Sequence, residues 1–104
     1  MISINIYEDD ESGILTKFTV QGHAGYAVRG HDIVCAAVSA LMYATVEALQ
    51  SRFRVDINEC EGFISCRIIK PDSASNLLVK AFKEGARMLS QQYSDYVNLH
   101  RHYL

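Results

Sequence analysis

One stretch decides the fold: residues 32–50, which read DIVCAAVSALMYATVEALQ. Asp32 is a typical N-cap residue, and the alanine-rich run from Ile33 to Gln50 predicts a helix. Its apolar stripe contains Val34, Val38, Leu41, Thr45 and Leu49, and is widened by Met42 and Val46. Because more than one face is apolar, we expect this helix to be buried on two sides, by a sheet and by either a second helix or another subunit.

A β-hairpin is expected before this helix. Residues 2–7 alternate between apolar and polar side chains, residues 9–13 have the composition of a turn, and residues 14–21 alternate again. The apolar face of the second strand would contain Ile14, Phe18 and Val20.

A second hairpin is expected after the helix, with strands over residues 53–60 and 63–70 around a turn at residues 61–62. This turn would place Cys60 opposite Phe63.

The rest of the chain predicts a second helix and a terminal strand. Pro71 ends the preceding strand, and residues 72–75 open a helix. The apolar stripe of this helix would contain Leu78, Ala81, Phe82, Gly85, Met88 and Leu89. Residues 97–103 alternate, which indicates a short terminal strand. The sequence therefore predicts an α+β fold: two β-hairpins and the terminal strand in a mostly antiparallel sheet, with two helices packed against it.

Length and composition limit the class of protein. The 104 residues, 49% of them hydrophobic, predict a single domain over residues 1–104. Ten basic and twelve acidic residues give a net charge of -2, which offers no electrostatic case for direct nucleic-acid or membrane binding. Residues 1–6 lack the layout of a signal peptide, and the three cysteines make no disulfide framework. We expect a cytoplasmic protein.

Residues 22–35 contain the strongest candidates for chemistry. Cys35 falls in the first turn of the predicted helix, where amide N–H groups without helical partners stabilise a thiolate, the nucleophilic form of cysteine. His23 lies in the glycine-rich loop that must return to this helix start, so its imidazole is a candidate general acid and base. Nucleophile, acid–base group and free amides are the parts of a cysteine hydrolase. The residues alone leave open that Cys35 is a packing residue and His23 a structural one.

Two neighbouring residues have alternative roles. Asp32 is expected to cap the helix by accepting from the amides of Val34 or Cys35, but its carboxylate could instead orient His23. Ser39, one turn after Cys35, could hydrogen-bond near the site or bond back to a helix carbonyl.

The other reactive residues favour no cofactor or metal. Cys60 and Cys66 would lie on opposite faces of one hairpin, which favours packing or surface roles. His100 and His102 are too few for a metal site, and a solvated tail is expected there. Residues 52–54, with two arginines flanking a phenylalanine, are expected to be a solvated edge rather than an RNA-contacting patch.

The sequence around the candidate site resembles that of a known family. Gly-His-Ala-Gly-Tyr-Ala at residues 22–27, followed by Gly-x-Asp-Ile-Val-Cys-Ala-Ala-Val-Ser at residues 30–39, is similar to the ribosomal-processing cysteine proteases, the Prp family. The likeness extends to total length, element order and the alanine-rich first helix.

The resemblance implies a bacterial cysteine endopeptidase that removes a short N-terminal extension from a large-subunit ribosomal protein. By this likeness His23 and Cys35 match the catalytic dyad, and Gly22, Asp32 and Ser39 match other motif positions. It also implies a homodimer.

From residues and resemblance together we expect a cytoplasmic, homodimeric cysteine protease without cofactor or metal. The loop that contains Gly25, Tyr26 and Gly30 would form one wall of the peptide groove. Two alternatives stay open: a non-catalytic ribosome-associated binding module, and a small thiol redox sensor.

Overall fold

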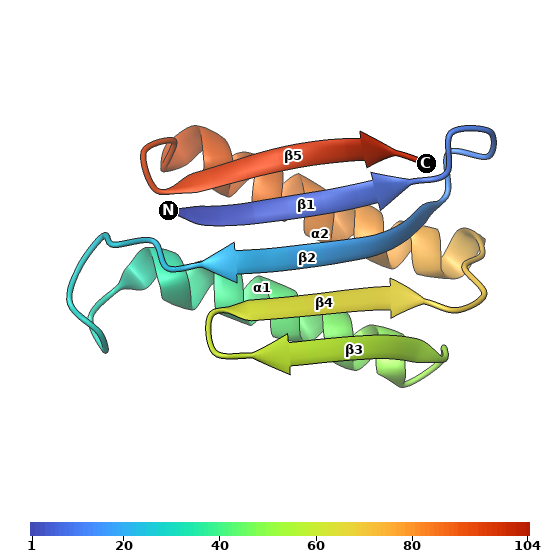
Figure 1. Cartoon of the computed structure of the whole chain (residues 1–104), viewed down its shortest axis with the longest axis horizontal. Helices are drawn as coiled ribbons and strands as arrows, with labels where there is room; N and C mark the ends of the chain where they lie inside the picture. The colour runs from blue at the N-terminus through green and yellow to red at the C-terminus, as the bar shows by residue number, and fades with distance from the viewer.

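Two helices cover one face of a five-stranded sheet (Figure 1) in the computed structural model, which describes residues 1–104. The helices are α1 (Ile33–Gln50) and α2 (Ser73–Gln92), and the strands are β1 (Ile2–Glu8), β2 (Leu15–Gly22), β3 (Val55–Cys60), β4 (Phe63–Ile68) and β5 (Val97–Tyr103). The strand order is β3-β4-β2-β1-β5; β5 pairs with β1 in parallel and the other pairs are antiparallel. The predicted α+β fold is confirmed.

The apolar helix α1 begins and ends where the sequence predicts. Its buried residues are Val34, Val38, Met42, Thr45, Val46 and Leu49. Its second apolar face meets α2, where a β-carbon added to Gly85 would lie 2.8 Å from a methyl carbon of Leu41. The second apolar face of α1 is therefore covered by α2, one of the two possibilities that the sequence left open. Length and composition alone would also suit a membrane span, but here α1 packs on the sheet and on α2.

The first hairpin departs from the prediction beside its turn. Ile14 was expected on the buried face, but it precedes β2, and Leu15 is buried instead. The cause is an irregular ladder, in which Tyr7 pairs with Lys17 while Glu8 pairs with Leu15, so one residue of β2 has no partner. A bulge of this kind shifts the alternation by one position and turns Leu15 inward. The prediction for Ile14 is wrong for this reason.

The second hairpin has the register that its two-residue turn predicts. Cys60 pairs with Phe63, and Ile57 pairs with Cys66. The helix-facing side chains of β4 are buried: Ile64, Cys66 and Ile68.

Helix α2 buries a different stripe from the predicted one. Its buried residues are Ser75, Val79, Phe82 and Ala86. Of the predicted positions, Phe82 is right, whereas Ala81 and Met88 are exposed. The helix starts with a capping box, in which Ser75 and Asp72 exchange hydrogen bonds and Ser75 is fully buried. The sheet-facing side therefore starts at Ser75, and of the predicted stripe Gly85 faces Leu41 of α1.

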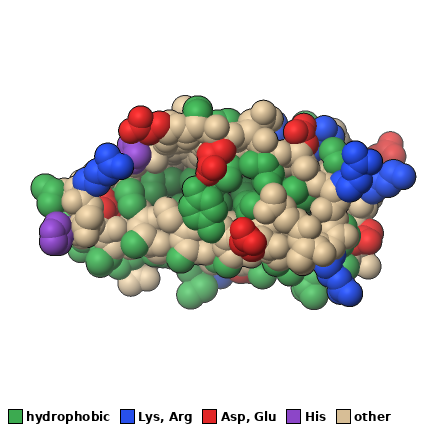
Figure 2. Space-filling view, turned by 90° about the horizontal axis from the view of Figure 1, so that it is seen from below, with side chains coloured by type: hydrophobic (Ala, Val, Ile, Leu, Met, Phe, Trp, Pro, Cys, Tyr) green, Lys and Arg blue, Asp and Glu red, His purple; other side chains and the backbone are tan.

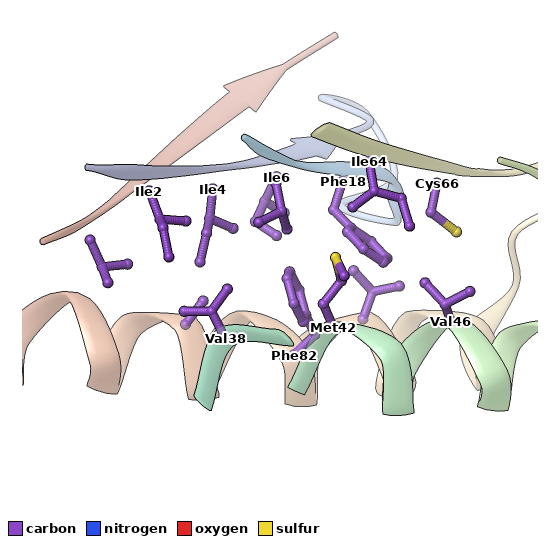
Figure 3. Packing of buried hydrophobic residues seen from close by; sticks show 14 of the residues in the cluster. Ile2, Ile4, Ile6, Phe18, Val38, Met42, Val46, Ile64, Cys66 and Phe82 are labelled. Carbon is purple, nitrogen blue, oxygen red and sulfur yellow. The ribbon is translucent and has the colours of Figure 1, made fainter. Parts of the chain in front are cut away.

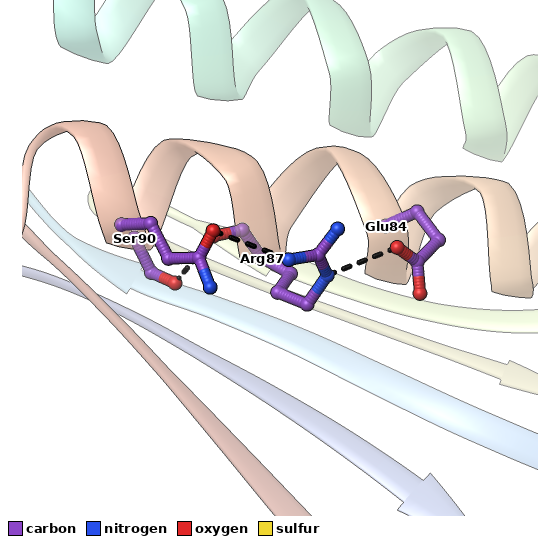
Figure 4. A network of polar contacts seen from close by, with 4 residues as sticks. Glu84, Arg87 and Ser90 are labelled. Atoms are coloured by element: carbon purple, nitrogen blue, oxygen red, sulfur yellow. Dashed lines mark hydrogen bonds and ion pairs between the residues drawn. The ribbon is translucent and has the colours of Figure 1, made fainter.

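The outer side of α2 is polar (Figure 4). The guanidinium of Arg87 donates to Glu84 at 3.0 Å and to Gln91 at 3.1 Å, and the Ser90 hydroxyl donates to the Arg87 carbonyl at 2.8 Å. Exposed pairs of this kind contribute only a few tenths of a kcal/mol, roughly 0.2–0.5 each, so packing holds α2 in place.

The predicted terminal strand is present and pairs with β1 along its whole length. His102 is half-buried because it faces Tyr7 across this pair: the two rings stack with centroids 4.6 Å apart, and the imidazole contacts Asn5 Oδ1 at 2.8 Å. The expected solvated tail is therefore wrong for His102, whereas His100 is exposed.

An aromatic pair joins the sheet to α2 inside the core (Figure 3). Phe18 and Phe82 are fully buried, and their ring centroids lie 4.5 Å apart. Around them Figure 3 shows Ile4, Ile6, Met42, Ile64 and Cys66 between the sheet and the helices. One continuous hydrophobic cluster therefore joins both layers.

We expect Phe82→Ala to lower the free energy of unfolding by about 3–5 kcal/mol, because it deletes a ring from a packed core. Lys80→Ala is the matched control on the same helix: its side chain is exposed, and a surface change of this kind stays within about 0.5 kcal/mol. Urea denaturation followed by circular dichroism measures both. Equal losses of stability would contradict this account of the core.

Candidate active site

Cys35 lies in the first turn of α1, half-buried, as the sequence predicts. The backbone N–H of Ala24 donates to its Sγ at 3.3 Å. Ala24 is itself buried, so the contact is anchored in the core. The loop after β2 therefore returns to the helix start and presents an amide to the sulfur. The sulfur thus accepts a backbone N–H at the positive end of the helix dipole.

The carboxylate of Asp32 ties this loop to the helix. Its Oδ1 accepts from the amides of Val34 and Cys35 at 3.0 and 2.9 Å. Its Oδ2 accepts from the amides of Tyr26 and Ala27 at 3.0 and 3.4 Å. Hydrogen bonds to the charged form, that from Cys35 first, lower the pKa of Asp32 against the opposing effect of desolvation. The capping role is confirmed, and both oxygens are engaged by backbone rather than by His23.

Gly22 fixes where His23 leaves the sheet. Its φ is +95°, which disfavours any residue with a β-carbon, and such a carbon would also overlap the carbonyl oxygen of Met1. Its N–H donates to the carbonyl of Gly62 at 2.8 Å. The end of β2 is thereby held between the start of β1 and the β3–β4 turn.

His23 follows directly and is exposed. Its Nε2 lies beside the β3–β4 turn, 3.4 Å from where a β-carbon of Gly62 would be. Neither Asp32 nor Cys35 is a hydrogen-bond partner of the imidazole here. His23 and Cys35 nevertheless line the same two cavities.

These two cavities meet at His23, Cys35 and Ser39. The inner one, of about 190 Å³, lies between α1 and the β3–β4 hairpin. The outer one, of about 570 Å³, lies under the glycine-rich loop and is lined by Gly25, Ala27, Arg29, Gly30, Asp32, Ala36 and Glu61. Figure 2 looks onto the edge formed by β3 and α1 and shows a hollow with hydrophobic side chains on its floor.

The other predicted site residues are placed differently from one another. Ser39 is exposed and lines both cavities, without a hydrogen bond to a helix carbonyl. Gly25 and Gly30 line the outer cavity. Tyr26 lines neither cavity; its ring packs edge-on against Tyr93 and Tyr96, with centroids 5.8 and 5.1 Å away, and so anchors the loop.

Sequence reasoning missed four contributors to this site. The Ala24 amide, Gly62, Tyr43 and Glu59 all lie at the sulfur, at the imidazole or along the inner cavity. Gly62 and Glu59 come from the β3–β4 hairpin, which strand register brings here, whereas Tyr43 lies on α1 two turns after Cys35.

The remaining cysteines are unpaired and differ in exposure. Burial raises the pKa of the Cys66 thiol to about 11, whereas Cys60 is exposed. No three His, Cys, Asp or Glu side chains are arranged to hold a metal ion.

Comparison with known proteins places the chain in a family. A family model for cysteine protease Prp matches residues 1–98. The chain belongs to the Prp family. A ribosomal processing cysteine protease Prp of Staphylococcus aureus (strain Mu50 / ATCC 700699) is 29% identical over an alignment of 104 positions. This alignment covers 95% of this chain and 97% of the relative. The relative of the same name from Bacillus subtilis (strain 168) is 41% identical over 49 residues, 47% of this chain and 43% of the relative.

Solved structures of Prp proteins have the same fold. The S. aureus protease in complex with a covalently linked product peptide superposes with a TM-score of 0.91 at 28% identity, over 97% of this chain and 99% of that one. Its complex with a substrate peptide gives a TM-score of 0.85 at 27% identity, over the same shares of the two chains. The protein is therefore a cysteine protease with the Prp fold.

The double role of Asp32 predicts a pH-dependent loop. Because its folded pKa is lowered, its contribution is fully present above the ordinary carboxyl value of about 3.9 and is lost as the pH falls through the lower folded pKa. We expect the amide proton shifts of Tyr26 and Ala27, followed by NMR, to lose their hydrogen-bonded positions over that acidic range.

Asp32→Asn separates the two oxygens. The amide oxygen still accepts from Val34 and Cys35, whereas the NH₂ group cannot accept from Tyr26 and Ala27. The loop amides should then show unbonded shifts at every pH. Wild-type shifts in this variant would contradict the assignment of Oδ2.

Proposed function

We propose that Cys35 is the nucleophile and His23 the general acid and base of a peptide-bond hydrolysis. The observation that carries the proposal is the Ala24 N–H donating to Cys35 Sγ at 3.3 Å. It joins the histidine-bearing loop to the sulfur at the start of α1, where both side chains line shared cavities.

The first step is attack of the Cys35 thiolate on the scissile carbonyl, which places negative charge on its oxygen. The amides of Val34 and Cys35 are engaged by Asp32, so the helix start offers neither as an oxyanion donor. The Ala24 amide already points at the sulfur that the carbonyl carbon will bond. It therefore lies beside the developing oxyanion, and the glycine-rich loop supplies the oxyanion donors.

The second step needs the imidazole at the leaving amine. His23 is exposed and its side chain is held by no hydrogen bond, so it can turn from Gly62 toward Cys35 at little cost. As imidazolium it protonates the amine and the C–N bond breaks, leaving an acyl-enzyme. As neutral imidazole it then takes a proton from water, whose oxygen attacks the thioester and releases Cys35.

We propose as substrate the N-terminal extension of a large-subunit ribosomal protein. Support comes from the relatives, which are named ribosomal processing proteases, and from the S. aureus protein bound to substrate and product peptides. The two cavities meeting at Cys35 suit a peptide that runs past the sulfur on both sides. Such a substrate places the protein in the bacterial cytoplasm.

A homodimer is part of the same proposal. It is supported by the family resemblance and by two exposed apolar side chains on α2, Leu77 and Met88. They are about three turns apart and so share one side of the helix.

Cleavage of the precursor ribosomal protein of the source bacterium tests the proposal. We expect wild-type protein to release a shortened product, seen by mass spectrometry, and Cys35→Ala to release none. His23→Ala should slow the reaction by roughly 10²–10⁴, the usual contribution of acid–base catalysis. His100→Ala is the matched control for the histidine, because its exposed side chain lines neither cavity, and it should cut at the wild-type rate.

Other outcomes would favour the alternatives. Cleavage by Cys35→Ala at the wild-type rate would contradict the assignment of Cys35 as the nucleophile. Absence of any cut by wild type would favour a ribosome-associated binding module, and a response to oxidant without cleavage would favour a thiol sensor.

Thiol labelling tests the thiolate with internal controls. At neutral pH, we expect iodoacetamide to modify Cys35 faster than Cys60, because only Cys35 has an amide donor at the start of a helix. Cys66 should stay unmodified, since burial raises its pKa. Peptide mapping by mass spectrometry reads all three rates, and His23→Ala should slow labelling of Cys35 alone. Equal rates for Cys35 and Cys60 would contradict the stabilised thiolate.

A further inference from the structure

A single hydrogen bond joins α1 to the edge strand β3. The hydroxyl of Tyr43 donates to Glu59 Oε2 at 2.7 Å. Donation to Glu59, with smaller effects from burial and from the negative charge, raises the pKa of Tyr43. Tyr43 is therefore the donor throughout the physiological range, and the bond persists there.

The pair stands at the far end of the inner cavity. Cys35, Ser39 and Tyr43 recur every four residues along one side of α1, which places Tyr43 roughly 12 Å beyond Cys35. All three line the cavity, together with Glu59 from the opposite wall.

The space in front of the pair is small, and nine of its fourteen lining residues are hydrophobic. Its apolar lining comes from α1 and from the sheet: Ile2, Val20, Val38, Met42, Phe63 and Ile64. Its volume of about 190 Å³ is below the roughly 300–1,000 Å³ of pockets that hold a whole small molecule. One side chain of a peptide that lies against Cys35 is the occupant that fits this size.

Glu59 is the one Asp, Glu, Lys or Arg in this lining, and Tyr43 neutralises part of its effect by donating to it. Glu59 is exposed, and without the hydroxyl its carboxylate would be free to pair with a cationic occupant of the cavity.

We propose that Tyr43 and Glu59 are specificity-determining residues, whose hydrogen-bonded pair bounds one end of the inner cavity and favours an apolar substrate side chain there. This inference rests on the proposed peptide hydrolysis at Cys35. The ring of Tyr43 sets the depth of the cavity, and its hydroxyl keeps the Glu59 carboxylate away from the occupant.

A purely structural role makes a different prediction. If the pair only fastens the β3–β4 hairpin to α1, its loss lowers thermal stability and weakens all peptides alike. A wall instead changes the order of preference among peptides. Preference, rather than overall affinity, is thus the readout.

The test is a peptide series bound to the non-cleaving Cys35→Ser protein. The parent peptide is the substrate peptide crystallised with the S. aureus relative, with Leu, Phe, biphenylalanine or Lys placed in turn on each side of the cleaved bond. Isothermal titration calorimetry gives the affinities. Glu47→Ala, one turn beyond Tyr43 on α1 and outside the cavity, is the matched control.

At one of the two positions, we expect Tyr43→Ala to improve biphenylalanine relative to Phe at least 10-fold, because the far wall is gone. Tyr43→Phe keeps the ring but frees the carboxylate, and should improve Lys relative to Phe several-fold. Adding Glu59→Gln to Tyr43→Phe removes the free carboxylate and should return the ratio of the Lys to the Phe affinity to its value before the Tyr43 substitution. Glu47→Ala should leave every ratio unchanged.

Unchanged ratios in Tyr43→Ala and Tyr43→Phe would overturn the inference, as would a parent protein that binds none of the peptides. These binding results are independent of turnover. If wild-type protein binds the series with the expected preferences but cleaves nothing, the proposed hydrolysis is wrong. The specificity role of Tyr43 and Glu59 would then still be supported.

Discussion

The site depends on one carboxylate that accepts four backbone hydrogen bonds. Asp32 uses one oxygen to cap α1 and the other to hold the first residues of the glycine-rich loop. A helix start and a loop both have N–H groups without backbone partners, so one carboxylate between them stabilises the helix start and the loop at once. With the loop tied down in this way, the Ala24 amide can lie against Cys35 instead of following the loop into solvent. The thiolate then has a donor that the helix alone does not supply.

Local signals in the sequence were enough for most of the fold. Asp32 and the alanine-rich run give both ends of α1, and the two-residue turn after Cys60 gives the register of the second hairpin. The predictions of buried side chains fail where contacts between residues far apart in the sequence determine which side chain is buried. A bulge beside the turn of the first hairpin shifts the alternation by one residue and buries Leu15 in place of Ile14, and α2 buries the side that starts at Ser75, so that Met88 faces outward.

The same division holds for the site. Cys35 and His23 stand out because their motif lies within one short segment, and the prediction that they lie near each other required only a loop that returns. Gly62 and Glu59 could not be found in this way. They reach the cavity through the pairing of β2 with β4 and of β4 with β3, and strand order is not encoded in the spacing of any motif. Tyr43 lies on α1 two turns after Cys35, so its helical spacing was the signal that could have found it. The identity of Glu59 as a wall residue depends on α1 lying opposite an edge strand.

The parallel pairing of β5 with β1 has a consequence for how the protein is made. Residues 2–8 can complete their sheet only after residues 97–103 have left the ribosome, because β1 needs a neighbour on each side. The start of β1 is also where Gly22 fits against Met1, directly before His23. A chain that lacks residues 97–103 therefore leaves one edge of β1 unpaired, beside the glycine that leads into His23.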